Sequence, residues 1–189
     1  MAKTRISYQG MEGSNSEEAA RLFVERLAIE DYELVPLVSS KNVVQSLLTG
    51  SCQKGVVAIK NSIGGRVEES YEALKDLDYK KLSSLSLRIH HSLFVRDSGV
   101  SAQEIKVVAS HIQALAQCKE SLSRLLGQAR TQEIEDTAIG AYHLAQGLLA
   151  RDTAVLCRLN AGQDQGLHLL YENIEDRDDN YTDFIIFSL

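Results

Sequence analysis

The sequence has little of several residue types that would point to a specific class of protein. It contains one proline and no tryptophan, and aromatic residues make up only 6% of its 189 residues. Its three cysteines, Cys52, Cys118 and Cys157, are far apart and show no Cys-x-x-Cys spacing. This pattern excludes a disulfide framework and the usual zinc ligands. We therefore expect free thiols and a reducing compartment, the cytoplasm.

The chain also lacks an excess of positive charge and any long apolar run. Its 26 acidic and 20 basic side chains give a formal charge of −6 at pH 7, whereas nucleic acids and anionic membranes attract basic surfaces. No run approaches the roughly 20 apolar residues that span a bilayer. The first residues contain no apolar signal region. We expect neither a nucleic acid nor a membrane as a partner.

Two further motifs are incomplete. The spacing Gly10-x-x-Gly13 lacks the third glycine of a dinucleotide-binding fingerprint. The five histidines include the adjacent pair His90 and His91, and none has the spacing of metal ligands. We therefore expect no nucleotide cofactor and no metal site.

What is present is an alternation of short β-branched runs with segments of helical periodicity. Hydrophobic residues make up 44% of the chain and charged residues 24%, which is typical of a globular protein with one large domain or two small lobes. The predicted strands are Arg5–Gln9, Tyr32–Leu37, Val56–Ile59, Leu85–Val95, Lys106–Ala109, Thr131–Ile134, Thr153–Leu156, Leu167–Tyr171 and Thr182–Phe187. The predicted helices are Ala19–Leu27, Ser39–Leu48, Val67–Leu74, Ile112–Leu126 and Ala138–Leu149. Such alternation predicts an α/β fold with mostly parallel sheets.

Several predicted strands end in small polar residues that precede a helix. These residues are Ser14–Ser16, Asn61–Ser62, Ser110 and Thr137, and we expect Ser110 and either Asp136 or Thr137 to cap helices. Ligands of open α/β sheets bind beyond the carboxyl ends of the strands, where helix N-termini offer free N–H groups. The pattern is compatible with a site for a small polyanion, although caps of this kind occur in every α/β protein.

Six short pieces of the sequence carry a more specific signal. They are Ile6–Ala20 (ISYQGMEGSNSEEAA), Asn61–Gly65 (NSIGG), Leu87–His91 (LRIHH), Ser110–Cys118 (SHIQALAQC), Asp136–Ala138 (DTA), and Asn173–Asp176 (NIED) with Asn180–Phe184 (NYTDF). In this order and at this spacing they resemble the prephenate dehydratases and the related arogenate dehydratases over nearly the whole chain. The glycine pair and the LRIHH piece are somewhat similar to the arogenate branch.

The resemblance implies an architecture and a reaction. It implies two α/β lobes with a ligand cleft between them, similar to type II periplasmic binding proteins. Lobe 1 would hold residues 1–84 and 171–189, and lobe 2 residues 85–170, without the family's further regulatory domain. Prephenate would lose its ring carboxylate as CO₂ and its ring hydroxyl as water, a lyase reaction that gives phenylpyruvate for phenylalanine biosynthesis. The resemblance implies no metal and no organic cofactor, and a homodimer or higher homo-oligomer in the cytoplasm.

The resemblance also implies roles for individual residues. Thr182 matches the threonine of the family's Thr-Arg-Phe motif, which is thought to donate a proton to the leaving hydroxyl. The other expected catalytic residues are Asn61, Ser110, Gln117 and Glu135. The expected substrate-binding residues are Ser14, Asn15, Ser16, Ser62, His111, Thr137 and Lys60.

Three positions depart from the family motifs. Asp183 replaces the arginine of Thr-Arg-Phe, Lys60 replaces the glutamate of Pro-Ile-Glu-Asn, and Ile112 replaces the proline of Ser-His-Pro-Gln. If the arginine and the glutamate pair in the family, Lys60 and Asp183 are that pair with its charges exchanged. Asp183→Arg would then harm folding or activity, and Lys60→Glu would restore it. Lys60 could instead bind a substrate carboxylate itself.

Alternative functions follow from these departures. The protein could be an arogenate dehydratase, which gives phenylalanine directly. It could be a binding or regulatory homologue that senses an aromatic or shikimate-derived acid without turnover. It could also be a related decarboxylase that does not aromatise its substrate.

Overall fold

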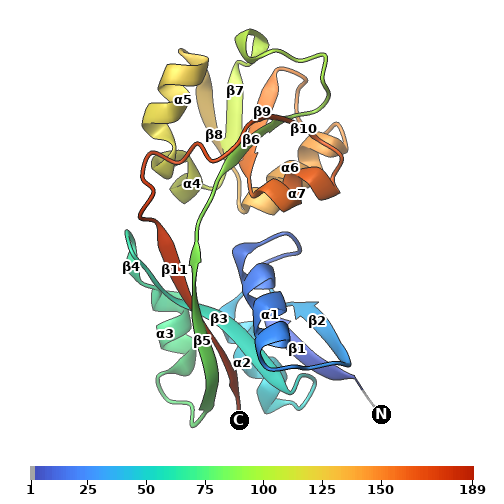
Figure 1. The fold of residues 1–189 in the computed structure, drawn as a ribbon, viewed down its shortest axis with the longest axis vertical. Coiled ribbons are helices and arrows are strands. Elements are labelled where there is room, and N and C mark those ends of the chain that lie inside the picture. Colours follow the sequence, from blue (N-terminus) through green and yellow to red (C-terminus); the bar gives the residue numbers. More distant parts are fainter. Residues whose placement is uncertain (1–2) are drawn as a thin grey trace. The chain divides into compact units, whose positions relative to one another are not determined.

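The computed structural model describes residues 3–189, and the chain divides into two compact units (Figure 1). Unit 1 extends to Ile89 and includes Asp179–Leu189, whereas unit 2 is His90–Asp178. The chain therefore leaves unit 1 after Ile89 and returns to it at Asp179. No helix in the described part of the chain is both long and apolar enough to cross a membrane.

Unit 1 is a mixed sheet with helices on both faces. Its elements are β1 (Thr4–Tyr8), α1 (Asn15–Arg26), β2 (Tyr32–Pro36), α2 (Ser40–Leu48), β3 (Lys54–Asn61), β4 (Gly65–Arg66), α3 (Glu68–Leu74), β5 (Lys80–Arg88) and β11 (Tyr181–Ser188). The strand order is β2-β1-β3-β11-β5, and β4 pairs with β3. β1 is parallel to β2 and β3, whereas β11 is antiparallel to β3 and β5.

The two faces of this sheet have separate cores. One core packs against α1 and contains Phe23, Val56 and Phe184, and the other packs against α2 and α3 and contains Val57 and Phe187. Alternate residues of β3 and β11 thus enter opposite cores, as the period of a strand requires. This alternation decides which polar residues at the strand ends share a face.

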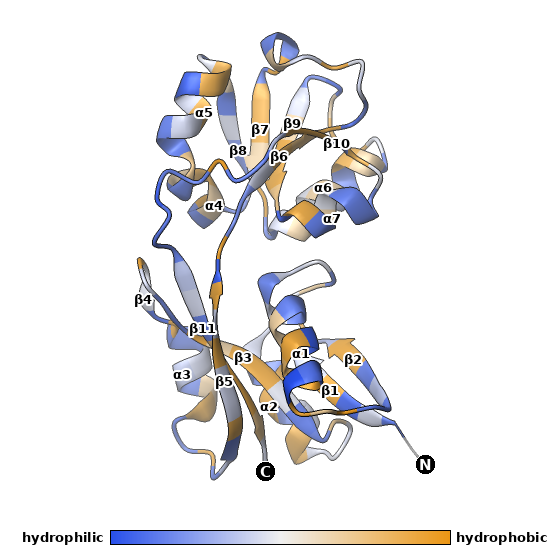
Figure 2. Cartoon of the chain, in the orientation of Figure 1, coloured by the Kyte–Doolittle hydropathy of each residue, from blue (hydrophilic) through white to orange (hydrophobic). Residues whose placement is uncertain are grey.

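Unit 2 is a second mixed sheet. Its elements are β6 (Ser92–Val95), a 3₁₀ turn (Ala102–Glu104), β7 (Val107–Ser110), α4 (Ile112–Gln117), α5 (Lys119–Leu126), β8 (Arg130–Glu133), α6 (Thr137–Ala145), β9 (Thr153–Cys157), α7 (Leu159–Asp164) and β10 (His168–Tyr171). The order is β10-β6-β9-β7-β8, with β7 parallel to β8 and β9. Figure 2 shows a hydrophobic β7 beside a hydrophilic β8, whose four residues are exposed at the sheet edge.

The α/β class is confirmed, and both sheets are mixed where the sequence predicted mostly parallel ones. β11 pairs antiparallel with its neighbours in unit 1, and β6 does so with β9 and β10 in unit 2. The predicted strand Leu85–Val95 is wrong as one element. It ends as β5 at Arg88 and resumes as β6 at Ser92, because this run of residues crosses from one unit to the other.

The predicted helix Ile112–Leu126 is also divided, at Cys118. The carboxylate of Asp176 accepts hydrogen bonds from the backbone N–H groups of Glu120 and Ser121 (2.9 and 2.8 Å). These N–H groups have no acceptor within the helix, because α5 begins a new first turn at Lys119. A carboxylate 56 residues away along the chain thus caps a helix start that local periodicity does not reveal.

Candidate functional site

The predicted site residues are divided between the two units. Unit 1 contains Ser14–Ser16, Lys60–Ser62 and Thr182, and unit 2 contains Ser110, His111, Gln117, Glu135 and Thr137. Each group is described within its own unit.

In unit 1, a β-bulge brings Asn61 and Thr182 onto the same face of the sheet. Thr182 is the register partner of Asn61, and Phe184 is the partner of Ala58. Between these pairs the register shifts, so that Ile59 is an extra residue on β3. Strict alternation from Ala58 would send Asn61 to the opposite face, and the bulge turns it back toward Thr182.

The carboxamide of Asn61 has a fixed orientation. Its Oδ1 accepts hydrogen bonds from the backbone N–H groups of Ile63 (3.0 Å) and Gly64 (2.8 Å). Only the carbonyl end of an amide can accept, so Nδ2 must point the other way. There it donates to Thr182 Oγ1 (2.9 Å) and to Asn180 Oδ1 (2.8 Å). The turn after β3 therefore holds Asn61 as a donor to Thr182.

Thr182 is held as a hydrogen-bond acceptor and keeps its own proton available. Its side chain is 9% exposed, and within residues 3–189 its hydroxyl proton has no hydrogen-bond acceptor. A ligand oxygen could take that proton. The alkoxide that remains would be stabilised by the Asn61 Nδ2 donor, because a hydrogen bond to the charged form favours it.

Asn180 is part of this group, although sequence reasoning gave it no role. It is 1% exposed, its Oδ1 accepts from Asn61, and its Nδ2 is buried without a partner in the described chain. It lies two residues before Thr182, and residues two apart in a strand share a face. That spacing is the signal that could have identified it.

Ser62 lies beside this group, but its hydroxyl serves the backbone. Its Oγ donates to the carbonyl of Asp179 and accepts from the N–H of Tyr181, both at 2.8 Å. Ser62 therefore holds the first residues of β11 in register with the turn after β3.

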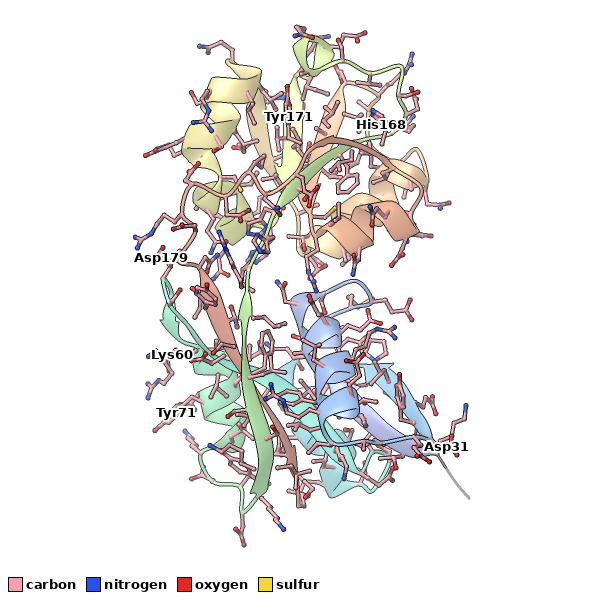
Figure 3. All side chains as sticks on the ribbon, in the orientation of Figure 1. Asp31, Lys60, Tyr71, His168, Tyr171 and Asp179 are labelled. Atoms are coloured by element: carbon pink, nitrogen blue, oxygen red, sulfur yellow. The ribbon has the colours of Figure 1, made fainter. Side chains whose placement is uncertain are left out.

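Lys60 and Asp183 are direct cross-strand neighbours on the other face. They are register partners, one position away from the Asn61–Thr182 pair, so their side chains point away from Thr182. The carboxylate of Asp183 accepts a hydrogen bond from Ser86 Oγ, and no ion pair joins it to Lys60 in the described chain. Figure 3 shows Lys60 and Tyr71 on the same side of unit 1. The exchanged-pair hypothesis stays a prediction, with the two residues in a suitable register.

We expect Asp183→Asn to change kcat and KM for the substrate by less than about threefold. The charge lies on the face away from Thr182, and exposed charges contribute about 1 kcal/mol or less. Asparagine Oδ1 keeps the acceptor for Ser86. Steady-state kinetics on the native protein and on Asp183→Asn checks this. Lys60→Gln, which changes the cross-strand partner of Asp183, is the matched control. A large fall in kcat for Asp183→Asn alone would show that this carboxylate acts on the reacting centre.

The segment before α1 forms a tight turn that presents Ser14. Gly10 and Gly13 have φ of +99° and +82°, and a Cβ on Gly10 would lie 2.9 Å from Ser14 Oγ. Ser14 is the N-cap of α1, and its side chain accepts from the N–H of Glu17. The N–H groups of Asn15 and Ser16 have no protein acceptor within the described residues, so α1 retains free donors for an anion.

In unit 2 the predicted cap Ser110 is wrong. Ser110 is the last residue of β7 and fully buried, and its Oγ donates to the carbonyl of Leu156 (2.8 Å). The N-cap of α4 is His111, whose Nδ1 accepts from the N–H of Gln113 (3.3 Å). The strand extends one residue further than predicted, because Ser110 still pairs with Glu133 of β8.

The start of α6 is capped by an acid. Asp136 is the N-cap, and its carboxylate accepts from the N–H groups of Ala138 (2.7 Å) and Ile139 (3.3 Å). Thr137 is the first helical residue, and Glu135 is exposed in the preceding loop. Because a carboxylate already occupies these donors, the helix start offers less to a substrate anion than sequence reasoning expected.

Gln117 ends α4 and contacts a buried histidine. Its Oε1 lies 2.7 Å from His91 Nε2, and its backbone carbonyl accepts from the N–H of Asp176 (2.8 Å). His91 is 5% exposed. Burial lowers the pKa of His91, against the opposing effects of the Gln117 hydrogen bond and the Glu175 carboxylate. Burial therefore favours the neutral form of the His91 imidazole.

We expect His91 to make the protein less stable in acid. The unfolded chain binds a proton at this residue below about pH 6.5, while the folded chain resists it, so the free energy of unfolding falls as pH decreases. His90 and Glu175 are the titratable groups that face it. In urea unfolding between pH 7.5 and 5, the free energy of unfolding should decrease less with falling pH for His91→Gln than for the native chain. The exposed His168→Gln should match the native chain, and equal slopes for all three would contradict the expectation.

Unit 2 also contains a hollow of about 500 Å³ that includes none of the predicted site residues. Val107 and Thr153 line it at the beginnings of β7 and β9, together with Arg130, Leu148 and Asp152. Ser110 ends β7, so the hollow lies at the opposite end of that strand, away from the carboxyl ends where α/β sheets bind ligands. Within residues 3–189 no cluster of His, Cys, Asp or Glu is arranged to hold a metal ion.

Comparison with known proteins identifies relatives over almost the full length. The chain is 32% identical to "Arogenate dehydratase 2" of Petunia hybrida over 187 residues, which is 99% of this chain and 45% of that protein. It is 33% identical to "Arogenate dehydratase/prephenate dehydratase 1, chloroplastic" of Arabidopsis thaliana, with the same shares covered. It is 30% identical to the "Bifunctional chorismate mutase/prephenate dehydratase" of Stutzerimonas stutzeri, over 96% of this chain and 48% of that one. The chain spans about half the length of these curated relatives.

A solved structure and a family model agree with these relatives. The prephenate dehydratase of Arthrobacter aurescens, solved in complex with L-Phe, matches with a TM-score of 0.85 at 26% identity, over 97% of this chain and 59% of that one. The family model described as "Prephenate dehydratase" matches residues 6–189. With the ordered motifs and the Asn61–Thr182 pair, this match establishes that the chain belongs to the prephenate dehydratase family.

Proposed function

We propose that this protein catalyses the decarboxylating dehydration of prephenate to phenylpyruvate in phenylalanine biosynthesis. The observation that carries the proposal is the Asn61–Thr182 hydrogen bond of 2.9 Å, in a chain of this family. It leaves a buried hydroxyl with a free proton and with a donor fixed on its oxygen. We further propose a cytoplasmic homodimer or larger homo-oligomer, as the family resemblance implies.

The proposed reaction needs one proton transfer from the protein. The bond between the ring and its carboxylate breaks and releases CO₂, and the electron pair enters the ring. The ring C–O bond breaks at the same time, and the hydroxyl leaves as water with the proton of Thr182. Aromatisation supplies the driving force, so positioning and a general acid suffice. Water then returns a proton to the Thr182 alkoxide, which Asn61 stabilises until that step.

The remaining residues are proposed to bind the substrate. The free N–H groups of Asn15 and Ser16 at the start of α1 are suited to a carboxylate. Within unit 2, Gln117 and His111 are the residues proposed for substrate contact. Ser110 is proposed to act only through the fold, because its buried hydroxyl is bonded to Leu156.

The test is turnover by the purified protein with prephenate and with arogenate. Phenylpyruvate from prephenate supports the proposal, and phenylalanine from arogenate as the better substrate assigns the chain to the arogenate branch. A thermal shift in the presence of either acid without product would favour a binding homologue, because a ligand stabilises the fold to which it binds. A decarboxylated product that is not aromatic would indicate the third alternative. If the protein forms no product and shows no thermal shift with either acid, the proposed substrates are refuted.

A further inference from the structure

The buried histidine His91 stands next to a proposed site residue and has no assigned role. Its Nε2 lies 2.7 Å from Gln117 Oε1. A carboxamide oxygen can only accept, so His91 must carry its proton on Nε2. The other nitrogen, Nδ1, is then an unprotonated lone pair, and it is buried without a partner in the described chain.

The backbone on both sides holds the imidazole in this state. The N–H of His91 donates to Glu175 Oε2 (3.0 Å), and its carbonyl accepts from the N–H of Ile174 (2.8 Å). The other oxygen of Glu175 lies 2.6 Å from His90 Nδ1, and neither oxygen is hydrogen-bonded to His91 Nδ1. A second proton on His91 would therefore create a buried N–H without an acceptor, which is costly.

The protonated Nε2 of His91 fixes the orientation of the Gln117 carboxamide. Its Oε1 is occupied by His91, and its Nε2 has no acceptor within residues 3–189. The carboxamide thus has its oxygen oriented toward His91, and its two N–H donors are left for a ligand. Such donors suit the carboxylate or keto oxygens of an acid.

We propose that His91 is a positioning residue that fixes Gln117 as a hydrogen-bond donor to the oxygen atoms of the substrate. The inference rests on the proposed function, since it needs a substrate that Gln117 contacts. It adds a residue that acts through Gln117 and never touches the substrate. It also explains why a histidine rather than an apolar residue lies in this part of unit 2.

A double-mutant cycle tests the proposal. His91→Phe keeps the volume and removes the donor, and Gln117→Leu removes the carboxamide. We expect each change to lower kcat/KM by roughly tenfold, the loss of one well-placed hydrogen bond, and the double variant to be no worse than Gln117→Leu. Independent losses that multiply to roughly a hundredfold would overturn the proposal. Unchanged kcat/KM in Gln117→Leu would also overturn it.

Two variants separate positioning from general damage. His91→Gln offers an amide donor in place of Nε2 and should recover part of the lost kcat/KM, whereas a purely structural role predicts no such recovery. His90→Gln alters the neighbouring histidine, which Gln117 does not contact, and should leave kcat/KM within about twofold. If the native chain shows no turnover, the affinity for prephenate by calorimetry replaces kcat/KM in the same cycle.

The proton position has a readout that does not depend on activity. In ¹⁵N-labelled protein at pH 8 and at pH 7, the imidazole nitrogens of His91 should show Nε2 protonated and Nδ1 bare. A Nδ1–H tautomer at either pH would overturn the inference about His91 and leave the proposed reaction standing. If the native protein turns over neither prephenate nor arogenate, the proposed reaction is refuted, whereas the expected spectrum of His91 stays the same.

Discussion

Thr182→Val is expected to lower kcat for prephenate by about 10²- to 10⁴-fold, the usual contribution of a general acid. Valine keeps the shape of threonine and removes a buried hydroxyl that combines an available proton with a fixed donor on its oxygen. The binding contacts proposed for α1 and Gln117 are unaffected, so KM should change little. The measurement is steady-state formation of phenylpyruvate, with arogenate as the second substrate.

The fold should survive this change. Asn61 Nδ2 loses Thr182 but keeps Asn180 Oδ1 at 2.8 Å, so the free energy of unfolding should fall by only about 1 kcal/mol. Thr182→Ser is the matched control, because it restores a hydroxyl at the same position and should recover much of kcat. Turnover by Thr182→Val at the native rate would remove Thr182 from the chemistry and would point to another proton source.

The sequence was sufficient for the fold class and for the family, and its motifs named Thr182 and Asn61 as candidate site residues. Buried strands such as Val56–Ile59 are visible as β-branched runs, and the motifs appear in the order of the family. Local patterns predict such features because they depend on residues that are adjacent in the chain.

The geometry at the end of β3 could not be predicted in the same way. The bulge at Ile59 depends on pairing with β11, and the bonded atoms of Asn61 and Thr182 are 121 residues apart. No property of the run Val56–Asn61 marks where the extra residue falls. Asp183 is adjacent to Thr182 in the sequence, whereas alternation along β11 directs its carboxylate to the opposite face.

Long-range contacts also account for the missed residues. His91 and Gln117 are 26 residues apart and lie in different elements, and an adjacent His-His pair gives no hint of which nitrogen is bonded. Ser110 was expected at a helix start because serine is a good cap. The hydrogen bond from its hydroxyl to Leu156 of β9 reflects the sheet order, which one strand alone does not reveal.

Asn61→Asp is expected to lower kcat at pH 7.5 by at least about 10²-fold while the fold survives. The new side chain keeps an oxygen for the N–H groups of Ile63 and Gly64, so the turn after β3 is retained. Its second oxygen replaces the donor that faced Thr182. Thr182 must then donate its proton to this carboxylate, and the proton is no longer available to the leaving hydroxyl. The added negative charge also opposes the formation of an alkoxide at Oγ1.

Asn180 explains why stability should be preserved in this variant. Its Nδ2 has no partner in the described chain, so its carboxamide can turn and donate to the new carboxylate. By contrast, Asn61→Ala removes the acceptor of the turn as well as the donor to Thr182. It should lower the free energy of unfolding by about 1–3 kcal/mol in addition to lowering kcat. Chemical denaturation of the two variants separates these effects.

The dependence of kcat on pH distinguishes this explanation from simple damage to the site. A carboxyl group that is partly buried beside acceptor oxygens has a raised pKa, and its protonated form is a donor that can again bond to Thr182 Oγ1. The activity of Asn61→Asp should therefore rise relative to that of the native chain as pH falls from 7.5 toward 5. Thr182→Val has no such group, and its activity relative to the native chain should stay constant over that range. If Asn61→Asp shows no recovery in acid, the Asn61 donor is not what makes Thr182 an acid, and a different residue must stabilise the alkoxide.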